Sequence, residues 1–325
     1  MMDRNGNGNG NGNGDAERGT AENGTGENGT EELRRLCPED LTPFAEGGNS
    51  GVYLLDQDKV VKVFHKDIPQ DMVYYENTLS REAYAAGVPC PACYGMVRVG
   101  DCLGIVYERA GSGDLLSAMI RDKTRIPDDI RAFARRVRFM HSRKVRPGYL
   151  KDAKQIFEAY LNRLEGHLCT PDEVLRLKRV CETIPDRSTF VHGDCHPDNV
   201  VIRDGKLVLV DLSACGFGHP VFDLAGMCSI YLLSAQDESH RKNLVAARDF
   251  TAAQCRLIWD TFLRSYFETE EEPFLKKVQE QVVGFVRVRH LLRTIIVPDE
   301  RLHLFAQAKR EALEYVDQGP EPLCF

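Results

Sequence analysis

The sequence of 325 residues has no long apolar run, no surplus of basic charge and no even set of cysteines. No stretch approaches the ~18 consecutive apolar residues of a membrane span, and no basic start followed by an apolar run marks a secretion signal. Lys and Arg number 42 against 49 Asp and Glu, and the resulting net charge of −7 argues against nucleic-acid binding. We therefore expect a soluble cytoplasmic protein with neither a nucleic-acid nor a membrane partner; the composition does not indicate its oligomeric state.

The eleven cysteines are an odd number, and most lie in apolar or motif surroundings. Because no export signal is visible, reduced and mostly buried thiols are the expected state. Cys90 and Cys93 have the spacing of a redox or zinc pair, but no second such pair follows and prolines interrupt the segment. We expect neither disulfides nor metal binding at this pair.

The N-terminal segment consists largely of Asn-Gly repeats, with 7 Asn and 9 Gly in the first 30 residues. Such a segment buries too little apolar surface to offset the entropy lost on ordering. It predicts a disordered tail over residues 1–32.

From Leu41 the pattern changes to short β-branched and apolar segments. Residues 52–55 and 59–64 predict a hairpin, and residues 95–99 and 103–107 predict a second one. A helix is expected between the two hairpins, over 74–86. The first third of the chain is thus expected to hold about five antiparallel strands and one helix.

After Gly111 the pattern is mostly helical, with a short β-rich island at residues 190–210. Thr251 and Gln254 form a capping box ahead of an apolar stripe. An α+β architecture follows, with a small antiparallel-β N-lobe over 33–110 and a larger helical C-lobe over 111–325. The other helices are expected at residues 114–122, 127–141, 150–167, 172–183 and 274–293.

The densest set of chemical side chains lies in and after that island. Asp194 stands on a predicted loop, Asn199 follows five positions later, and a strand ends at Asp211 twelve positions after that. Phosphoryl transfer needs a carboxylate that orients the attacking hydroxyl and accepts its proton, and oxygen ligands that hold Mg²⁺. The three residues match this requirement.

Softer ligands are interleaved with these acids. His192, Cys195 and His196 suggest zinc, but no ligand set with zinc-site spacing completes a tetrahedron. We therefore favour Mg²⁺, and we interpret the two histidines as braces that hold the loop by hydrogen bonds.

The segment HGDCHPDN, residues 192–199, resembles the catalytic loop of the aminoglycoside phosphotransferase and choline kinase family. The resemblance implies a bilobal protein-kinase-like fold and ATP as co-substrate. It further implies that Asp194 is the catalytic base, that Asn199 and Asp211 bind Mg²⁺, and that Asp223 is mainly structural.

The N-lobe contains candidates for nucleotide binding. Lys62 lies within a predicted strand, as does the lysine that pairs with ATP phosphates in kinases. Glu82 is the expected ion-pair partner of Lys62, with Glu76 as the alternative on the same helix. By resemblance, the backbone carbonyl of Glu108 and the amide of Ala110 bind adenine. The loop expected over the phosphates departs from the usual glycine pattern and contributes Gly47, Gly48, Asn49 and Ser50.

Several protein-kinase features are absent from this sequence. Gly193 replaces the arginine before the catalytic aspartate, and only twelve positions separate Asp211 from Asp223. So short a segment leaves little platform for a peptide, which favours a small hydroxyl-bearing acceptor. Two alternatives stay open: a protein Ser/Thr kinase-like enzyme, and a pseudokinase that only binds nucleotide.

The class of acceptor also stays open. A cationic aminoglycoside would need acidic side chains, a choline-like substrate an aromatic cage, and an anionic substrate basic side chains. The acidic candidates are Asp223, Glu268 and Glu270–Glu272; the aromatic ones are Tyr231, Trp259 and Tyr266; the basic ones are Arg287, Arg289, His290 and Arg293.

Overall fold

The computed structural model describes residues 33–46, 48–111, 113–145 and 148–325. Residues 34–325 form one unit, to which the following description applies. The tail predicted to be disordered over 1–32 lies outside the described residues, as does Gly47.

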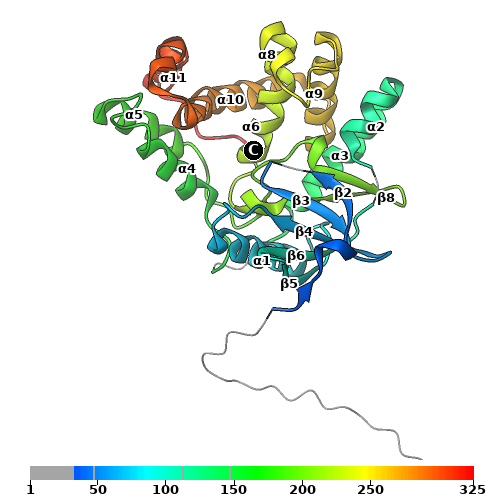
Figure 1. Ribbon diagram of the computed structural model, residues 1–325. Coiled ribbons are helices and arrows are strands. Elements are labelled where there is room, and N and C mark those ends of the chain that lie inside the picture. Colours follow the sequence, from blue (N-terminus) through cyan, green and yellow to red (C-terminus); the bar gives the residue numbers. More distant parts are fainter. Residues whose placement is uncertain (1–32, 47, 112, 146–147) are drawn as a thin grey trace, which may run out of the picture. The chain divides into compact units, whose positions relative to one another are not determined.

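Six strands form the main sheet, in the order β1-β5-β6-β4-β3-β2 (Figure 1). All neighbours run antiparallel except β1 and β5, which are parallel. Both predicted hairpins are confirmed, as β3–β4 and β5–β6. The strands are β1 (Arg35–Leu36), β2 (Thr42–Glu46), β3 (Ser50–Leu54), β4 (Lys59–Phe64), β5 (Cys93–Val99) and β6 (Cys102–Glu108).

One helix, α1 (Gln70–Ala85), packs against β5 and β6 of this sheet. It begins four residues earlier than expected, immediately after Pro69, whose fixed φ suits a helix start. Its buried face carries Val73, Glu76 and Leu79. Glu76 is therefore directed toward the protein interior.

The remainder of the chain is mainly helical, as predicted. In the described part of the chain, no helix has both the length and the apolar composition of a membrane span. The helices are α2 (Leu115–Arg121), α3 (Ile126–His141), α4 (Ala153–Asn162), α5 (Pro171–Glu182), α6 (Val221–Met227), α7 (Leu233–Gln236), α8 (Glu238–Asn243), α9 (Ala252–Phe267), α10 (Glu272–Leu291) and α11 (Ala306–Asp317).

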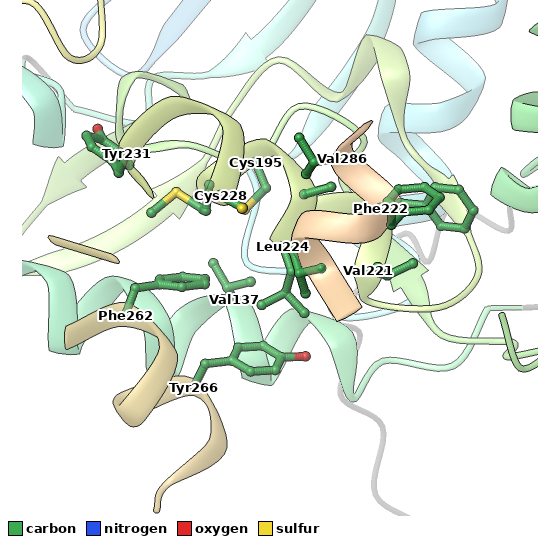
Figure 2. Packing of buried hydrophobic residues seen from close by; sticks show 14 of the residues in the cluster. Val137, Cys195, Val221, Phe222, Leu224, Cys228, Tyr231, Phe262, Tyr266 and Val286 are labelled. Atoms are coloured by element: carbon green, nitrogen blue, oxygen red, sulfur yellow. The ribbon is translucent and has the colours of Figure 1, made fainter. Parts of the chain in front are cut away.

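A continuous apolar core joins these helices, and α3 packs closely against α9 (Figure 2). Phe133 of α3 and Trp259 of α9 are fully buried. The capping box at the start of α9 is confirmed: Thr251 Oγ1 accepts from the amide of Gln254 at 3.2 Å, and the Gln254 side chain accepts from the amide of Thr251 at 2.9 Å.

Helix α4 is shorter than the predicted span of 150–167. Its N-cap is Asp152, whose side chain accepts from the amide of Lys154 at 2.8 Å. The carbonyl of Lys151 is bonded instead to the amide of Phe217, which keeps the preceding residues out of the helix. Tertiary pairing has overridden the helical pattern at this point.

Short strands and 3₁₀ turns interrupt the helices at the predicted β-rich island. Strands β8 (Val200–Arg203) and β9 (Lys206–Leu209) form a hairpin, and β7 (Phe190–Val191) pairs with β10 (Gly216–Phe217). Asn199 directly precedes β8 and Asp211 follows β9, so these two residues lie at the same end of the β8–β9 hairpin. All eleven cysteines are free thiols and seven are buried, which confirms that prediction.

Candidate active site

The loop between β7 and β8 is anchored by one buried carboxylate from α6. Asp223 is 1% exposed, and its two oxygens accept from the amides of His192 and Gly193, each at 2.7 Å. His141 Nε2 lies 2.9 Å from the same carboxylate. Burial acts to raise the pKa of Asp223, but the bonds and charges of these partners outweigh it, so the pKa lies below its usual value. The loop is thus fixed around an ionised group, as expected for a structural aspartate.

Gly193 has a φ of +82°, in the left-handed region that favours glycine. A Cβ atom there would lie 2.2 Å from the carbonyl oxygen of Ala214. No larger side chain fits without moving the backbone. The close approach explains why glycine stands where protein kinases carry arginine.

His192 holds the loop against the strand that leads to Asp211. Its ring is fully buried; Nε2 donates to the carbonyl of Val210 at 3.0 Å, and Nδ1 accepts from the amide of Asp194 at 3.4 Å. Burial lowers the pKa of His192, which favours this neutral form. The bracing role predicted for His192 agrees with these contacts.

Asp194 and Asn199 face each other across the loop. The Asn199 amide nitrogen donates to the Asp194 carbonyl at 2.9 Å and to its carboxylate at 3.0 Å. His196 Nε2 lies 3.4 Å from the other carboxylate oxygen. These contacts, the His196 hydrogen bond first among them, lower the pKa of Asp194 to about 2. The group is therefore ionised at neutral pH and able to accept a proton.

Asp211 adopts a left-handed backbone conformation, with φ 58° and ψ 69°. Such a conformation costs a non-glycine residue on the order of 1 kcal/mol, and strained residues of this kind cluster at functional sites. Its carboxylate accepts from Ser213 at 3.0 Å and lies 3.3 Å from Lys62 Nζ. Lys62 thus links the sheet to the end of the β8–β9 hairpin.

The partner of Lys62 on α1 is Glu76, at 2.7 Å, and the prediction of Glu82 is wrong. Six residues turn a helix by about 600°, which places the two glutamates about 120° apart on its surface. Glu76 lies on the buried face, whereas Glu82 is only half-buried. Burial lowers the pKa of Lys62, but the charges of Glu76 and Asp211 more than offset this, so Lys62 stays protonated.

A cavity of about 610 Å³ lies against these residues, within the range of small-ligand sites. Lys62, Glu76, Asn199 and Asp211 line it, and Asp194 adjoins it through Asn199. The other predicted nucleotide contacts that the structure describes also line it: Gly48, Asn49, Ser50, Glu108 and Ala110.

Sequence reasoning missed most of the apolar wall of this cavity. Val60 and Phe64 line it together with Lys62, because alternate residues of β4 point to the same face. That alternation was visible in the sequence. Ser213, which also lines the cavity, had no such signal.

The side chain of Glu108 also connects the main sheet to the β8–β9 hairpin. The carboxylate forms an ion pair with Arg203 of β8 and accepts from the amide of Ala92 at 3.3 Å. The last strand of the sheet is thereby tied to the hairpin that carries Asn199.

The donors present suit a hard divalent cation. The side-chain nitrogen of Asn199 donates a hydrogen bond to Asp194, so its side-chain oxygen is available to bind a metal ion. The carboxylate of Asp211 lines the same cavity. Carboxylate and amide oxygens are ligands that Mg²⁺ prefers.

The sequence and the fold were compared with those of known proteins. The sequence model of a phosphotransferase enzyme family matches residues 40–258. No curated protein matches the chain.

Solved structures match over most of the chain. A choline/ethanolamine kinase family protein from Mesorhizobium loti is similar with a TM-score of 0.53 and 18% identity, over 86% of this chain and 92% of that one. Amicoumacin kinase hAmiN, in complex with AMP-PNP, Ca²⁺ and Ami, is similar with a TM-score of 0.55 and 16% identity, over 90% of this chain and 92% of that one. A thermostable mutant of aminoglycoside phosphotransferase APH(4)-Ia, in complex with ADP and hygromycin B, is similar with a TM-score of 0.55 and 16% identity, over 86% of this chain and 94% of that one. The predicted bilobal, kinase-like α+β fold is confirmed.

The contact between His196 and Asp194 gives a testable result. The wild-type Asp194 carboxyl should stay ionised down to about pH 3, because its pKa is about 2. His196→Ala removes the largest contribution, so the pKa should rise toward the usual value of about 3.9. Side-chain ¹³C chemical shifts measured against pH would report both values. His303→Ala, which changes an exposed histidine, serves as the control; equal Asp194 titration in all three proteins would refute the contact.

Proposed function

The chain belongs to the phosphotransferase enzyme family, and we propose that it transfers the γ-phosphoryl group of ATP to a hydroxyl group of a small molecule. The supporting observation is the convergence of Lys62, Asn199 and Asp211 on one cavity with Asp194 beside it. These residues come from three separate segments of the chain: strand β4, the loop between β7 and β8, and the residues after β9.

ATP would bind in the 610 Å³ cavity, between a nucleotide-binding lobe of residues 33–110 and a catalytic lobe of residues 111–325. Adenine would lie against the backbone of Glu108 and Ala110, and the loop that contains Gly48, Asn49 and Ser50 would cover the phosphates. Lys62, held by Glu76 at 2.7 Å, would pair with the phosphates. Similar proteins solved with ADP or AMP-PNP support a nucleotide as the ligand.

Asn199 and Asp211 would hold Mg²⁺, which when bound neutralises charge on the phosphates. Asp194 would orient the acceptor hydroxyl and take its proton as the oxygen attacks. The bond between the γ-phosphorus and the bridging oxygen breaks, a bond to the acceptor oxygen forms, and ADP leaves. Asp194 then releases the proton to water.

The acceptor would be a small molecule rather than a protein. The twelve positions from Asp211 to Asp223 fold into a 3₁₀ turn, the two-residue strand β10 and the start of α6. They leave no extended segment for a peptide to lie on. The pseudokinase alternative is not favoured, because each residue to which the proposal gives a role lines the cavity or adjoins it.

Asp194→Asn tests the proposed base directly. The amide keeps the shape of the side chain but cannot accept the proton, so turnover should fall by about 10²–10⁴-fold. The Kd for Mg·ATP should change by no more than a few-fold. Turnover is measured by coupled ADP release with a panel of aminoglycosides, amino alcohols, sugars and nucleosides as acceptors. The Kd for Mg·ATP is measured by calorimetry. Asp204→Asn, in the exposed β8–β9 turn, is the matched control; undiminished turnover by Asp194→Asn would contradict the assignment.

The choice between the two glutamates of α1 is tested by a pair of variants. Glu76→Gln weakens the charged hydrogen bond to Lys62, worth about 1.5–3 kcal/mol, so kcat/KM should fall by about 10- to 150-fold. Glu82→Gln should remain within about twofold of the wild type, because Glu82 does not contact Lys62. Steady-state kinetics with saturating acceptor would show the difference. Equal losses in the two variants would mean that the ion pair does not position the lysine.

A further inference from the structure

Most of the side chains that the sequence suggested for binding the acceptor are engaged in contacts within the C-lobe. The acidic residues Glu268, Glu270 and Glu272 form ion pairs with arginines. The aromatic residues Tyr231, Trp259 and Tyr266 are buried in the core (Figure 2). The nucleotide side of the site, in contrast, contains a polar side chain to which the proposed function gives no role.

That side chain belongs to Tyr107, near the end of β6. The register of β4 and β6 places Lys62 opposite Ile105, so Tyr107, two positions further on, lies on the same face of the sheet as Lys62. Helix α1 packs against β6, and Lys62 and Tyr107 both line the cavity. Tyr107 is thus placed between the helix and the proposed nucleotide site.

The phenol oxygen of Tyr107 has two hydrogen-bond partners, and both are on α1. It lies 2.9 Å from Ser80 Oγ and 3.4 Å from Glu76 Oε1. An ionised carboxylate can only accept, so the phenol donates its one proton to Glu76 and accepts the proton of the Ser80 hydroxyl. Glu76 and Ser80 are four residues apart and therefore share one face of the helix. Tyr107 bridges them across one helical turn.

The oxygen that Tyr107 approaches is the same one that Lys62 binds. Lys62 Nζ lies 2.7 Å from Glu76 Oε1. This oxygen therefore accepts from two neighbouring strands, from Lys62 of β4 and from Tyr107 of β6. Donors from two directions restrict the rotation of a side chain more than a single donor does, so the contact of Tyr107 supports the orientation in which Glu76 meets Lys62.

Burial makes each donor to Glu76 count. Glu76 is 6% exposed, and burial raises the pKa of its carboxyl above the usual value, although Lys62 and Tyr107 both act in the opposite direction. Burial and the charge of Glu76 raise the pKa of Tyr107 well above its usual value, so the phenol keeps its proton and stays a donor. A buried acceptor that loses a partner is destabilised by more than the net value of an exposed hydrogen bond.

We propose that the hydroxyl group of Tyr107 positions the ion pair of Glu76 and Lys62, because it ties α1 to β6 and holds Glu76 Oε1 toward the lysine. The inference rests on the proposed function, in which Lys62 pairs with the phosphates of ATP, and adds a positioning residue to it. Ser80 completes the contact, since its hydrogen bond directs the phenol proton toward Glu76.

Tyr107→Phe tests the proposal, because it keeps the ring that lines the cavity and removes only the hydroxyl group. Tyr84→Phe, the same change at an exposed position of α1, is the matched control. Side-chain ¹³C chemical shifts of Glu76, measured against pH in the full chain without nucleotide, report the contact directly. The pKa of Glu76 should be higher in Tyr107→Phe than in the wild type, since a donor to the charged form is lost, and unchanged in Tyr84→Phe.

The kinetic test uses Mg·ATP and the best acceptor of the panel. In Tyr107→Phe, kcat/KM for ATP should fall about 2- to 12-fold, the range for the loss of one hydrogen bond. KM for the acceptor should stay within twofold of the wild type, and so should every constant of Tyr84→Phe. A general loosening of the structure would instead raise both KM values and lower the melting temperature. If no acceptor is turned over, calorimetry should show Mg·ATP binding to Tyr107→Phe at least twofold more weakly.

An unchanged Glu76 titration in Tyr107→Phe overturns the proposal, and so does an unchanged kcat/KM for ATP. Ser80→Ala is the second variant, which decides if Tyr107→Phe does not fold. It removes the bond that orients the phenol, so the pKa of Glu76 should rise and kcat/KM for ATP should fall, both by less than in Tyr107→Phe. Values equal to the wild type in Ser80→Ala would then overturn the proposal.

Failure of the proposed function looks different. In that case Mg·ATP itself does not bind, or Asp194→Asn leaves ADP release undiminished. ADP release that depends on Asp194 and Glu76 but not on the hydroxyl group of Tyr107 removes only the inference about Tyr107.

Discussion

The buried carboxylate of Asp223 is the constraint on which the site depends. A buried ion is costly unless its partners satisfy it, and Asp223 takes two backbone amides of the loop and one histidine ring. The amides belong to consecutive residues, His192 and Gly193, so the loop has one permitted path. That path requires a left-handed glycine packed against Ala214. Asp194 follows directly, so these backbone bonds fix the position of its main chain, and Asn199 and His196 hold its carboxylate.

The second organising interaction is the position of Lys62 between Glu76 and Asp211. It connects helix α1, strand β4 and the end of the β8–β9 hairpin, which are far apart in the sequence. The ion pair between Glu108 and Arg203 adds a second tie between the sheet and the hairpin. Both ties hold the sheet against the hairpin that carries Asn199 and Asp211, and these residues line the cavity together with Lys62.

Much of the fold could be predicted because local patterns agree with tertiary structure. The β-branched, apolar segments of β3 and β4 and the capping box at Thr251 specify their elements directly. The order of Asp194, Asn199 and Asp211 was likewise sufficient to predict that they meet, because a short hairpin joins the last two. The start of α4 could not be predicted, since the backbone bond from the amide of Phe217 to the carbonyl of Lys151 decides it.

The errors at the site have a common physical origin. Glu76 and Glu82 stand on one helix, and Glu76 is the one that shares the buried face with Val73 and Leu79. The sequence alone could not resolve Arg287 from Arg289 either, because periodicity defines a helix face but not the element it packs against. In the structure the two arginines differ in exposure: Arg287 is exposed and Arg289 is half-buried.

The most direct measurement of the central claim is a crystal structure with Mg²⁺ and a non-hydrolysable ATP analogue. The account predicts the triphosphate in the 610 Å³ cavity, with Lys62 on its phosphates, the ion bound by Asn199 and Asp211, and the γ-phosphate facing Asp194. A nucleotide bound outside this cavity, or an ion held without Asn199 and Asp211, would contradict it.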